Sequence, residues 1–220
     1  MPPGVFRPSE DTRILARHLR NGSSQDRQVL DLCTGSGALA VAAALGGARA
    51  VTAVDLSRRA VLAARLNASL NGVEVRALQS DLFTALGDRR FDLIASNPPF
   101  LPSVDAELPT RGVRRAWEAG HDGRALIDRI LAEAPKHLLP GGSLVMVHSS
   151  VCGTERTVDR LAGLGLEAEV VDRLRCPLGP LLAARAPELM RLGLLEPGLR
   201  DEEMVVVRGR LPEGRVPTWE

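Results

Sequence analysis

The tetrapeptide Asn97-Pro98-Pro99-Phe100 joins an amide, two rigid backbone units and an aromatic ring. It directly follows the apolar run 91–96, which is typical of a buried strand. Two consecutive prolines neither extend a helix nor donate to a central ladder, so they stiffen the chain where that strand ends. Ligands of open α/β sheets bind outside the carboxyl ends of the strands. This corner is therefore suited to hold a planar, hydrogen-bonding substrate group, although a tight turn with a core phenylalanine is the plainer interpretation.

A second motif, residues 29–40, joins a short apolar strand to a glycine-containing turn and an Ala-rich helical stretch. Gly35 and Gly37 let the backbone turn sharply and approach a ligand closely. A further strand, 50–54, ends in Asp55, 20 positions after Gly35, where an acid accepts hydrogen bonds from ribose hydroxyls. The spacing also satisfies the fingerprint of an NAD site.

Asp31 argues against NAD. It ends the first strand four residues before Gly35, so we expect its carboxylate to face the pocket. There it would repel a pyrophosphate and attract an ammonium group. A dehydrogenase also has no need of the corner at 97–100.

Together these residues resemble the class I S-adenosylmethionine (SAM)-dependent methyltransferases, over most of the chain. The segment 31–37 looks like their first motif, Asp55 like their ribose-binding acid and Ser80-Asp81-Leu82 like their adenine-contacting acid. Asn97 to Phe100 looks like the motif of enzymes that methylate amide or exocyclic amino nitrogens. Cys33 departs from the pattern, since the family often has glycine there, but a small side chain should be tolerated.

The resemblance implies SAM as the cofactor and implies a set of site residues. The catalytic residues would be Asn97, Pro98, Pro99 and Phe100. The cofactor-binding residues would be Thr12, Asp31, Cys33, Thr34, Gly35, Gly37, Asp55, Leu56, Asp81, Leu82 and Asn97.

A closer resemblance appears within this group. Residues 6–12 are similar to the Pro-x-Glu-Asp-Thr segment of the HemK-like protein-glutamine methyltransferases, particularly the short HemK2 branch. Residues 120–124 resemble the Gly-x-Asp-Gly that follows their catalytic loop. The resemblance implies a glutamine side chain of a protein, such as a release factor, as the methyl acceptor. It also implies a small activator subunit as a partner.

Helical and strand-like stretches alternate, which predicts an α/β fold with a mostly parallel, Rossmann-like sheet and helices on both faces. In the resembled family the sheet has seven strands and the last is antiparallel. We expect one domain over 1–220, with an N-terminal segment at 1–26 and a helical insertion at 176–198. Besides the strands above, we expect strands at 73–79, 143–148, 166–174 and 203–210, and helices at 9–20, 57–72, 123–137 and 182–195.

Composition sets broad limits. The 220 residues carry 28 basic and 27 acidic side chains, a net charge of +1, so no global basic field points to nucleic acid. A local basic patch keeps nucleic acid open. Cys33, Cys152 and Cys176 give no disulfide or zinc spacing, and we expect no metal site. We expect a cytoplasmic protein without a signal peptide, because no apolar run is long enough for a bilayer and the first residues lead into a charged stretch.

Two stretches leave the substrate open. In the loop 101–120, three arginines face three acids, which leaves it near neutral, and Trp117 either stacks on a base, closes over a peptide or packs the loop onto the domain. These residues are Arg111, Arg114, Arg115, Asp105, Glu107 and Glu118. The leucines of 176–198 suggest an apolar helix face that covers the pocket, contacts a partner or is purely structural. These are Leu181, Leu182, Leu189, Leu192 and Leu195.

The expected chemistry is an in-line methyl transfer to a weakly nucleophilic nitrogen. The Asn97 side-chain oxygen and the Pro98 carbonyl would accept the two N–H bonds, and Phe100 would press on the planar group. No strong base is needed, so His18, His121, His137 and His148 are read as structural. Alternatives are an adenine-N6 methyltransferase on RNA or DNA, a small-molecule methyltransferase, and a SAM- or NAD-binding protein without this catalysis. The intact corner weighs against a SAM-binding protein without catalysis and against an NAD-binding protein.

Overall fold

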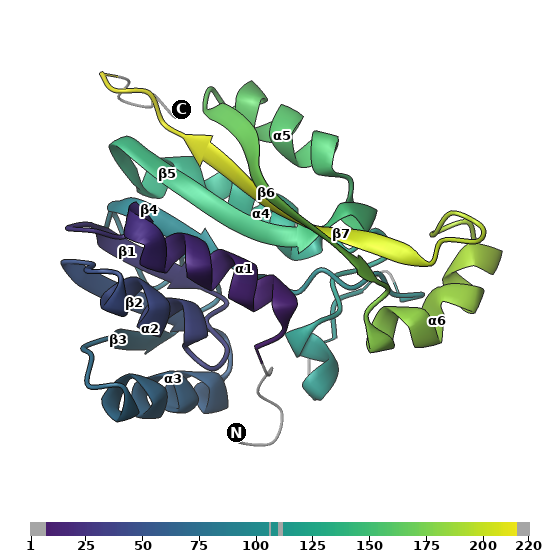
Figure 1. Cartoon of the computed structure of the whole chain (residues 1–220), viewed down its shortest axis with the longest axis horizontal. Helices are drawn as coiled ribbons and strands as arrows, with labels where there is room; N and C mark the ends of the chain where they lie inside the picture. Colours follow the sequence, from purple (N-terminus) through teal and green to yellow (C-terminus); the bar gives the residue numbers. More distant parts are fainter. Residues whose placement is uncertain (1–7, 106, 110–111, 215–220) are drawn as a thin grey trace.

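The computed structural model of the chain contains a seven-stranded sheet in the order β3-β2-β1-β4-β5-β7-β6 (Figure 1). It describes residues 8–105, 107–109 and 112–214, without the side chain of Val113. Phe6, Arg7 and Arg111, which carried sequence-based expectations, lie outside these residues. The strands are β1 Gln28–Leu32, β2 Ala50–Asp55, β3 Arg76–Gln79, β4 Phe91–Ser96, β5 Leu138–Ser149, β6 Glu167–Pro177 and β7 Asp201–Arg210.

The sheet is parallel from β3 to β5, and β7 runs antiparallel to both of its neighbours. This confirms the Rossmann-like fold class and the antiparallel last strand. The order places the ends of β1 and β4 side by side, with Leu32 opposite Ser96. The glycine turn and the Asn97 corner therefore start from adjacent positions at one edge of the sheet.

Helices cover both faces of the sheet. They are α1 Glu10–His18, α2 Ala38–Leu45, α3 Arg58–Leu70, α4 Ala125–Glu133, α5 Thr154–Gly163 and α6 Pro180–Arg191. Shorter helical turns are η1 Leu19–Ser23, η2 Val113–Ala116, η3 Ala134–His137 and η4 Ser150–Cys152. Helices α1 to α3 pack on one face and α4 and α5 on the other. α6 connects the end of β6 to the start of β7 and lies beyond that end of the two strands (Figure 1).

Two apolar cores result from the alternation of side chains along the strands. Leu30 and Leu32 of β1 join the core under α4 and α5, whereas Val29 joins the core under α1 to α3. Because both faces are covered, β1 and β4 read as continuous apolar runs. That is why their positions were easy to predict.

The turn between β1 and α2 depends on close helix packing. Gly37 has a φ of +83°, and a Cβ atom there would lie 2.8 Å from the Cα of Ala64 in α3. Ser57 caps α3 by accepting a hydrogen bond from the amide of Ala60, as its position predicted. These contacts fix the turn that begins α2 against α3.

Some predicted boundaries were wrong. β3 begins at Arg76, three residues after the predicted start. β5 begins at Leu138, five residues before the predicted start, and so includes the Pro-Gly-Gly at 140–142. α1 gives way to η1 after His18.

The helix predicted at 182–195 also has different bounds in the structure. α6 begins at Pro180, because proline suits the first turn of a helix, and it ends at Arg191 before Gly193, which has a φ of +70°. Leu181 and Leu192 are exposed, so the predicted apolar face contains only part of the expected leucines.

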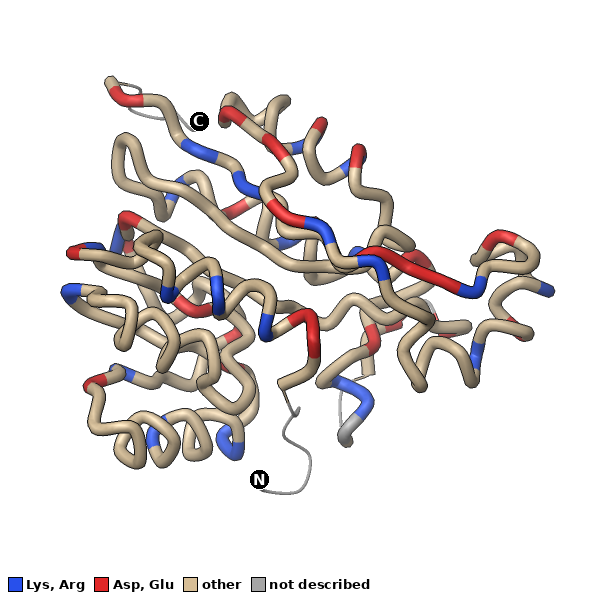
Figure 2. Tube along the Cα trace, viewed as in Figure 1, with Lys and Arg blue, Asp and Glu red and all other residues tan. Residues whose placement is uncertain are grey.

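Charges of both signs are spread along the chain rather than gathered by sign (Figure 2). On β6 and β7 they form cross-strand ion pairs, including Arg173 with Glu203 and Arg175 with Asp201. None of the described helices is long and apolar enough to cross a membrane.

Candidate active site

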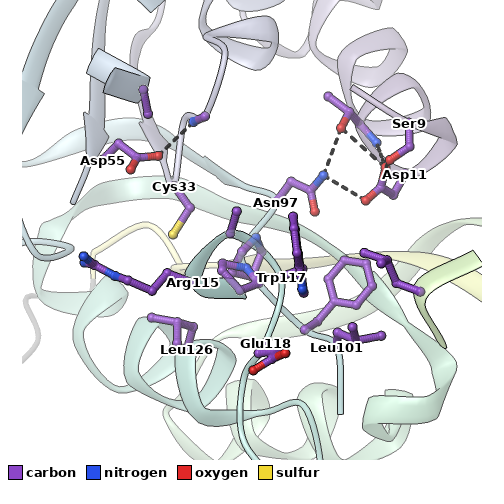
Figure 3. Close-up of a pocket in the computed structure, with 18 of the residues that line it drawn as sticks. Ser9, Asp11, Cys33, Asp55, Asn97, Leu101, Arg115, Trp117, Glu118 and Leu126 are labelled. Carbon is purple, nitrogen blue, oxygen red and sulfur yellow. Dashed lines mark hydrogen bonds between the residues drawn. The ribbon is translucent and has the colours of Figure 1, made fainter. Parts of the chain in front are cut away.

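A pocket of about 930 Å³ lies at the carboxyl ends of the central strands. It takes in both sequence motifs (Figure 3). Most of the predicted site residues line it: Thr12, Cys33, Thr34, Gly35, Asp55, Leu56, Asp81, Leu82, Asn97, Pro98, Pro99 and Phe100. Asp31 and Gly37 are not among the lining residues.

Asp55 connects the end of β2 to the glycine turn. Its Oδ2 accepts a hydrogen bond from the Gly35 amide at 2.9 Å, and its Oδ1 accepts one from the Ser57 amide at 2.8 Å. Burial raises the pKa of Asp55, while the two amides partly oppose that shift. The acid therefore shapes the turn as well as facing the pocket.

Asp31 lies beneath the turn, which corrects the expectation that its carboxylate faces the pocket. Its side chain is fully buried, and Oδ2 accepts hydrogen bonds from Thr34 Oγ1 at 2.5 Å and from the Ala40 amide at 3.0 Å. Oδ1 is buried and accepts no hydrogen bond from a described residue. Burial raises the pKa of Asp31 to about 7. Asp31 thus holds Thr34 at the pocket wall and retains one unused acceptor behind it.

Among the described lining residues, two that are not glycine adopt left-handed backbone conformations. Cys33 has a φ of +58° and Leu82 a φ of +47°. Residues with a Cβ atom are disfavoured in left-handed conformations. This is a physical reason why glycine, which the resembled family often has there, suits the Cys33 position. Beside Leu82, Asp81 accepts a hydrogen bond at 2.9 Å from Arg129 of α4. That contact links the segment after β3 to α4, on the face of the sheet that α4 and α5 cover.

The Asn97 amide has a defined orientation. Its Nδ2 donates to Asp11 Oδ2 at 3.1 Å and to Thr12 Oγ1 at 3.0 Å, both at the start of α1. A carboxylate accepts and cannot donate, so the nitrogen must face Asp11. The dashed lines from Asn97 start at its nitrogen, so its oxygen is left as an acceptor (Figure 3). The sequence did not predict Asp11 as a site residue, although Asp11 lies within residues 6–12, which resemble a segment of the HemK-like enzymes.

The corner is supported from behind by the loop that follows it. The Leu101 amide donates to the Trp117 carbonyl at 2.7 Å, and the Ala119 amide donates to the Leu101 carbonyl at 3.0 Å. Gly123 has a φ of +70°, and a Cβ atom there would lie 2.2 Å from the Phe100 carbonyl oxygen. The Gly-x-Asp-Gly segment therefore serves the corner by close packing, and His121 within it is exposed.

Further residues of the pocket were not predicted as site residues. Arg115, Trp117 and Glu118 line it from the loop after the corner, and Ser149 and Glu202 line it from the ends of β5 and β7. Trp117 also packs against the apolar residues of α6, which is one of the three roles expected for it. Nothing in a single sequence distinguishes these side chains from other polar and apolar residues.

The family model of the methyltransferase small domain matches residues 2–116, just over half of the 220 residues. The chain belongs to this family. It is 35% identical over 184 residues to a candidate protein N5-glutamine methyltransferase of Methanocaldococcus jannaschii, covering 84% of this chain and 92% of the relative. It is 42% identical over 174 residues to the release factor glutamine methyltransferase of Bordetella pertussis, covering 74% of this chain and 64% of that longer protein.

Solved structures share the fold. The complex of Mtq2 and Trm112 from E. cuniculi, which methylates the termination factor eRF1, matches 94% of this chain and 99% of the solved chain, with a TM-score of 0.65 and 20% identity. A T. thermophilus 16S rRNA methyltransferase in complex with AdoMet and guanosine matches 95% of this chain and 46% of the solved chain, with a TM-score of 0.61 and 24% identity. The family member described here is a SAM-dependent methyltransferase.

We predict that Asp31 makes the stability of this methyltransferase depend on pH. Because its folded-state pKa is raised, the folded protein binds an extra proton between about pH 4 and pH 7, so this residue's contribution to stability falls as the pH rises through that window. Asp31→Asn keeps an oxygen for Thr34 and Ala40 and removes the titration. Its stability relative to the parent should rise from pH 4 to pH 7, by about 1.4 kcal/mol for each unit of pKa shift.

Urea unfolding at a series of pH values measures this difference. The exposed Asp88→Asn provides a matched control that should show no comparable trend. A constant offset between Asp31→Asn and the parent across the window would contradict the prediction.

Proposed function

We propose that this methyltransferase modifies the side-chain nitrogen of a glutamine in a protein, with a translation release factor as the first candidate. The observation that carries the proposal is the corner after β4, where Asn97 lines the pocket and its Nδ2 donates to Asp11 and Thr12, so its oxygen is left as a hydrogen-bond acceptor. An oriented amide oxygen suits a planar NH2 donor. The names of the M. jannaschii and B. pertussis relatives support glutamine as that donor.

The charges of the pocket favour a protein acceptor over nucleic acid. Among the described lining residues, six are acidic and two are arginines. The acids are Glu10, Asp11, Asp55, Asp81, Glu118 and Glu202, and the arginines are Arg115 and Arg129. Nucleic-acid binding rests on cationic contacts with phosphates. A predominantly acidic pocket would repel a phosphate backbone but accept a neutral peptide.

The cofactor side of the pocket fits SAM. Bound there, SAM would supply a methyl group already activated by its sulfonium. Asp55 would accept hydrogen bonds from the ribose hydroxyls, and Leu56, Asp81 and Leu82 would contact the adenine. The unused Oδ1 of Asp31 would leave a polar atom beneath the turn that borders the amino-acid part of SAM. Gly37 would contribute through the shape of the turn.

On the acceptor side, the residues of the corner would position the glutamine amide. The Asn97 oxygen and the Pro98 carbonyl would accept its two N–H bonds, which localises the nitrogen lone pair for in-line attack on the methyl group. Phe100 would pack on the amide plane. The nitrogen then loses one proton, so the product is a neutral N-methylamide. Positioning of this kind contributes several kcal/mol without a strong base.

A small activator subunit is a further part of the proposal, suggested by the HemK2-like resemblance. The E. cuniculi protein of similar fold forms a complex with Trm112. A substrate in the translation apparatus would also place the reaction in the cytoplasm.

We predict that Asp55→Ala weakens SAM binding. The variant loses the proposed ribose contact and the hydrogen bond that shapes the turn at Gly35. Loss of hydrogen bonds to a charged group should cost roughly 1.5–3 kcal/mol, about 10- to 150-fold in affinity. Titration calorimetry with SAM and with NAD measures it. Parent-like SAM affinity in the variant, or tighter binding of NAD than of SAM by the parent, would refute the cofactor assignment.

We predict that Asp11→Ala slows methyl transfer more than it weakens SAM binding. It frees Asn97 to rotate, so the oxygen no longer has a single orientation. Loss of one charge-assisted hydrogen bond, roughly 1.5–3 kcal/mol, should lower kcat at least 10-fold. Glu10→Ala, a neighbouring exposed acid that does not contact Asn97, is the matched control. Equal losses in both variants would show that α1 acts only through its general charge.

We predict that the enzyme methylates release factor and not nucleic acid. Transfer of label from SAM should be measured into release factor, RNA and DNA across a salt series. Label in release factor should disappear when its target glutamine is replaced and should depend little on salt. Label confined to nucleic acid, with steep salt dependence, would favour the adenine alternative. Label in none of the three would favour a small-molecule acceptor.

A further inference from the structure

The pocket extends well beyond the corner, toward the helical insertion. Beyond the corner, its wall is formed by residues of 176–182, with Leu101 and Glu118 of the loop after the corner. The residues that fit SAM lie on the other side, at the ends of β1, β2 and β3. The acceptor half therefore has room for more of a substrate than one glutamine side chain.

Helix α6 belongs to this acceptor half and not to the two cores of the sheet. Leu182, Ala186 and Leu189 form a separate apolar cluster with Leu101, which directly follows Phe100. Trp117 packs against the same cluster. α6 thus forms one wall with Leu101 and Trp117, and Leu101 attaches this wall to the catalytic corner through the chain itself.

A buried ion pair fixes this wall. Arg185 Nη2 of α6 lies 2.6 Å from Glu118 Oε1, and the Glu118 side chain is only 1% exposed. A buried carboxylate is costly without a partner, so the pair holds α6 against the loop. At the start of α6, the Gly179 amide donates to Glu202 Oε1 at 2.9 Å. The wall is therefore attached at both the loop and β7.

One leucine of the wall remains uncovered. Leu181 lines the pocket and is 42% exposed, while the cluster behind it does not include it. Leu192, at the other end of α6, is similarly exposed at 46% but does not line the pocket. An exposed leucine in the same pocket as the corner gains favourable free energy when an apolar group covers it.

We propose that Leu181 and the wall behind it bind an apolar side chain that flanks the acceptor glutamine in the substrate polypeptide. The subsite is continuous with the corner that holds the glutamine, and it makes recognition depend on the neighbouring residue as well as on the amide. This inference rests on the proposed protein-glutamine activity and assigns the insertion 176–198 to substrate selection.

The test compares Leu181→Ala with Leu192→Ala, two exposed leucines of one helix segment. Methyl transfer into release factor is measured as KM and kcat, and SAM affinity is measured by calorimetry. Leu181→Ala should raise KM on the order of ten-fold, the value expected when a buried leucine contact is lost, and leave kcat and SAM affinity unchanged. Leu192→Ala should match the parent.

A second comparison changes the substrate. In synthetic peptides around the methylated glutamine, each flanking apolar residue is replaced in turn by serine. One replacement should raise KM for the parent by a similar factor and have little further effect with Leu181→Ala. Parent-like kinetics of Leu181→Ala, or equal effects of Leu181→Ala and Leu192→Ala, would overturn the subsite while leaving glutamine methylation intact. Absence of label in the parent's protein substrates would overturn the proposed function and the subsite with it.

Discussion

The hydrogen bonds from Asn97 to the start of α1 are the contact on which the site depends. Asn97 directly follows a central strand, whereas Asp11 and Thr12 come from a helix 86 and 85 positions earlier in the chain. A carboxylate that can only accept removes the ambiguity of the amide, so its oxygen has one direction. The pocket then presents an acceptor of N–H bonds beside a site for an activated methyl group.

Rigidity on both sides maintains that arrangement. The two prolines limit the backbone of the corner, and Gly123 allows the following segment to approach the Phe100 carbonyl closely. On the cofactor side, Asp55 and Asp31 accept amide and hydroxyl hydrogen bonds that shape the turn at 34–37. Asp31 is fully buried and Asp55 partly so, and the rise in their pKa values is the electrostatic consequence of using carboxylates as internal supports.

The sequence predicted the parts of the structure that have a strong local cause. Buried parallel strands read as apolar runs, Ser57 is a helix cap, and two prolines after a strand mark a corner. The order of the strands then brings the predicted motifs to one edge. The sequence did not predict that Asp31 turns beneath the glycine turn or that Asp11 orients Asn97, since both follow from tertiary contacts. The end of the loop after the corner and α6 were uncertain for the same reason: they meet through the ion pair of Glu118 with Arg185, 67 positions apart in the chain.

The most direct test of the account is single-turnover methyl transfer by Asn97→Ala preloaded with SAM, with the SAM dissociation constant measured on the same preparation. Asn71→Ala, an asparagine at the end of α3, serves as the control. We expect Asn97→Ala to bind SAM with near-parental affinity. Its rate of methyl transfer should fall on the order of a hundred-fold, as when a single positioned hydrogen-bonding group is removed from an active site. Parental transfer rates, or a loss of SAM affinity that accounts for the whole loss of rate, would contradict the account.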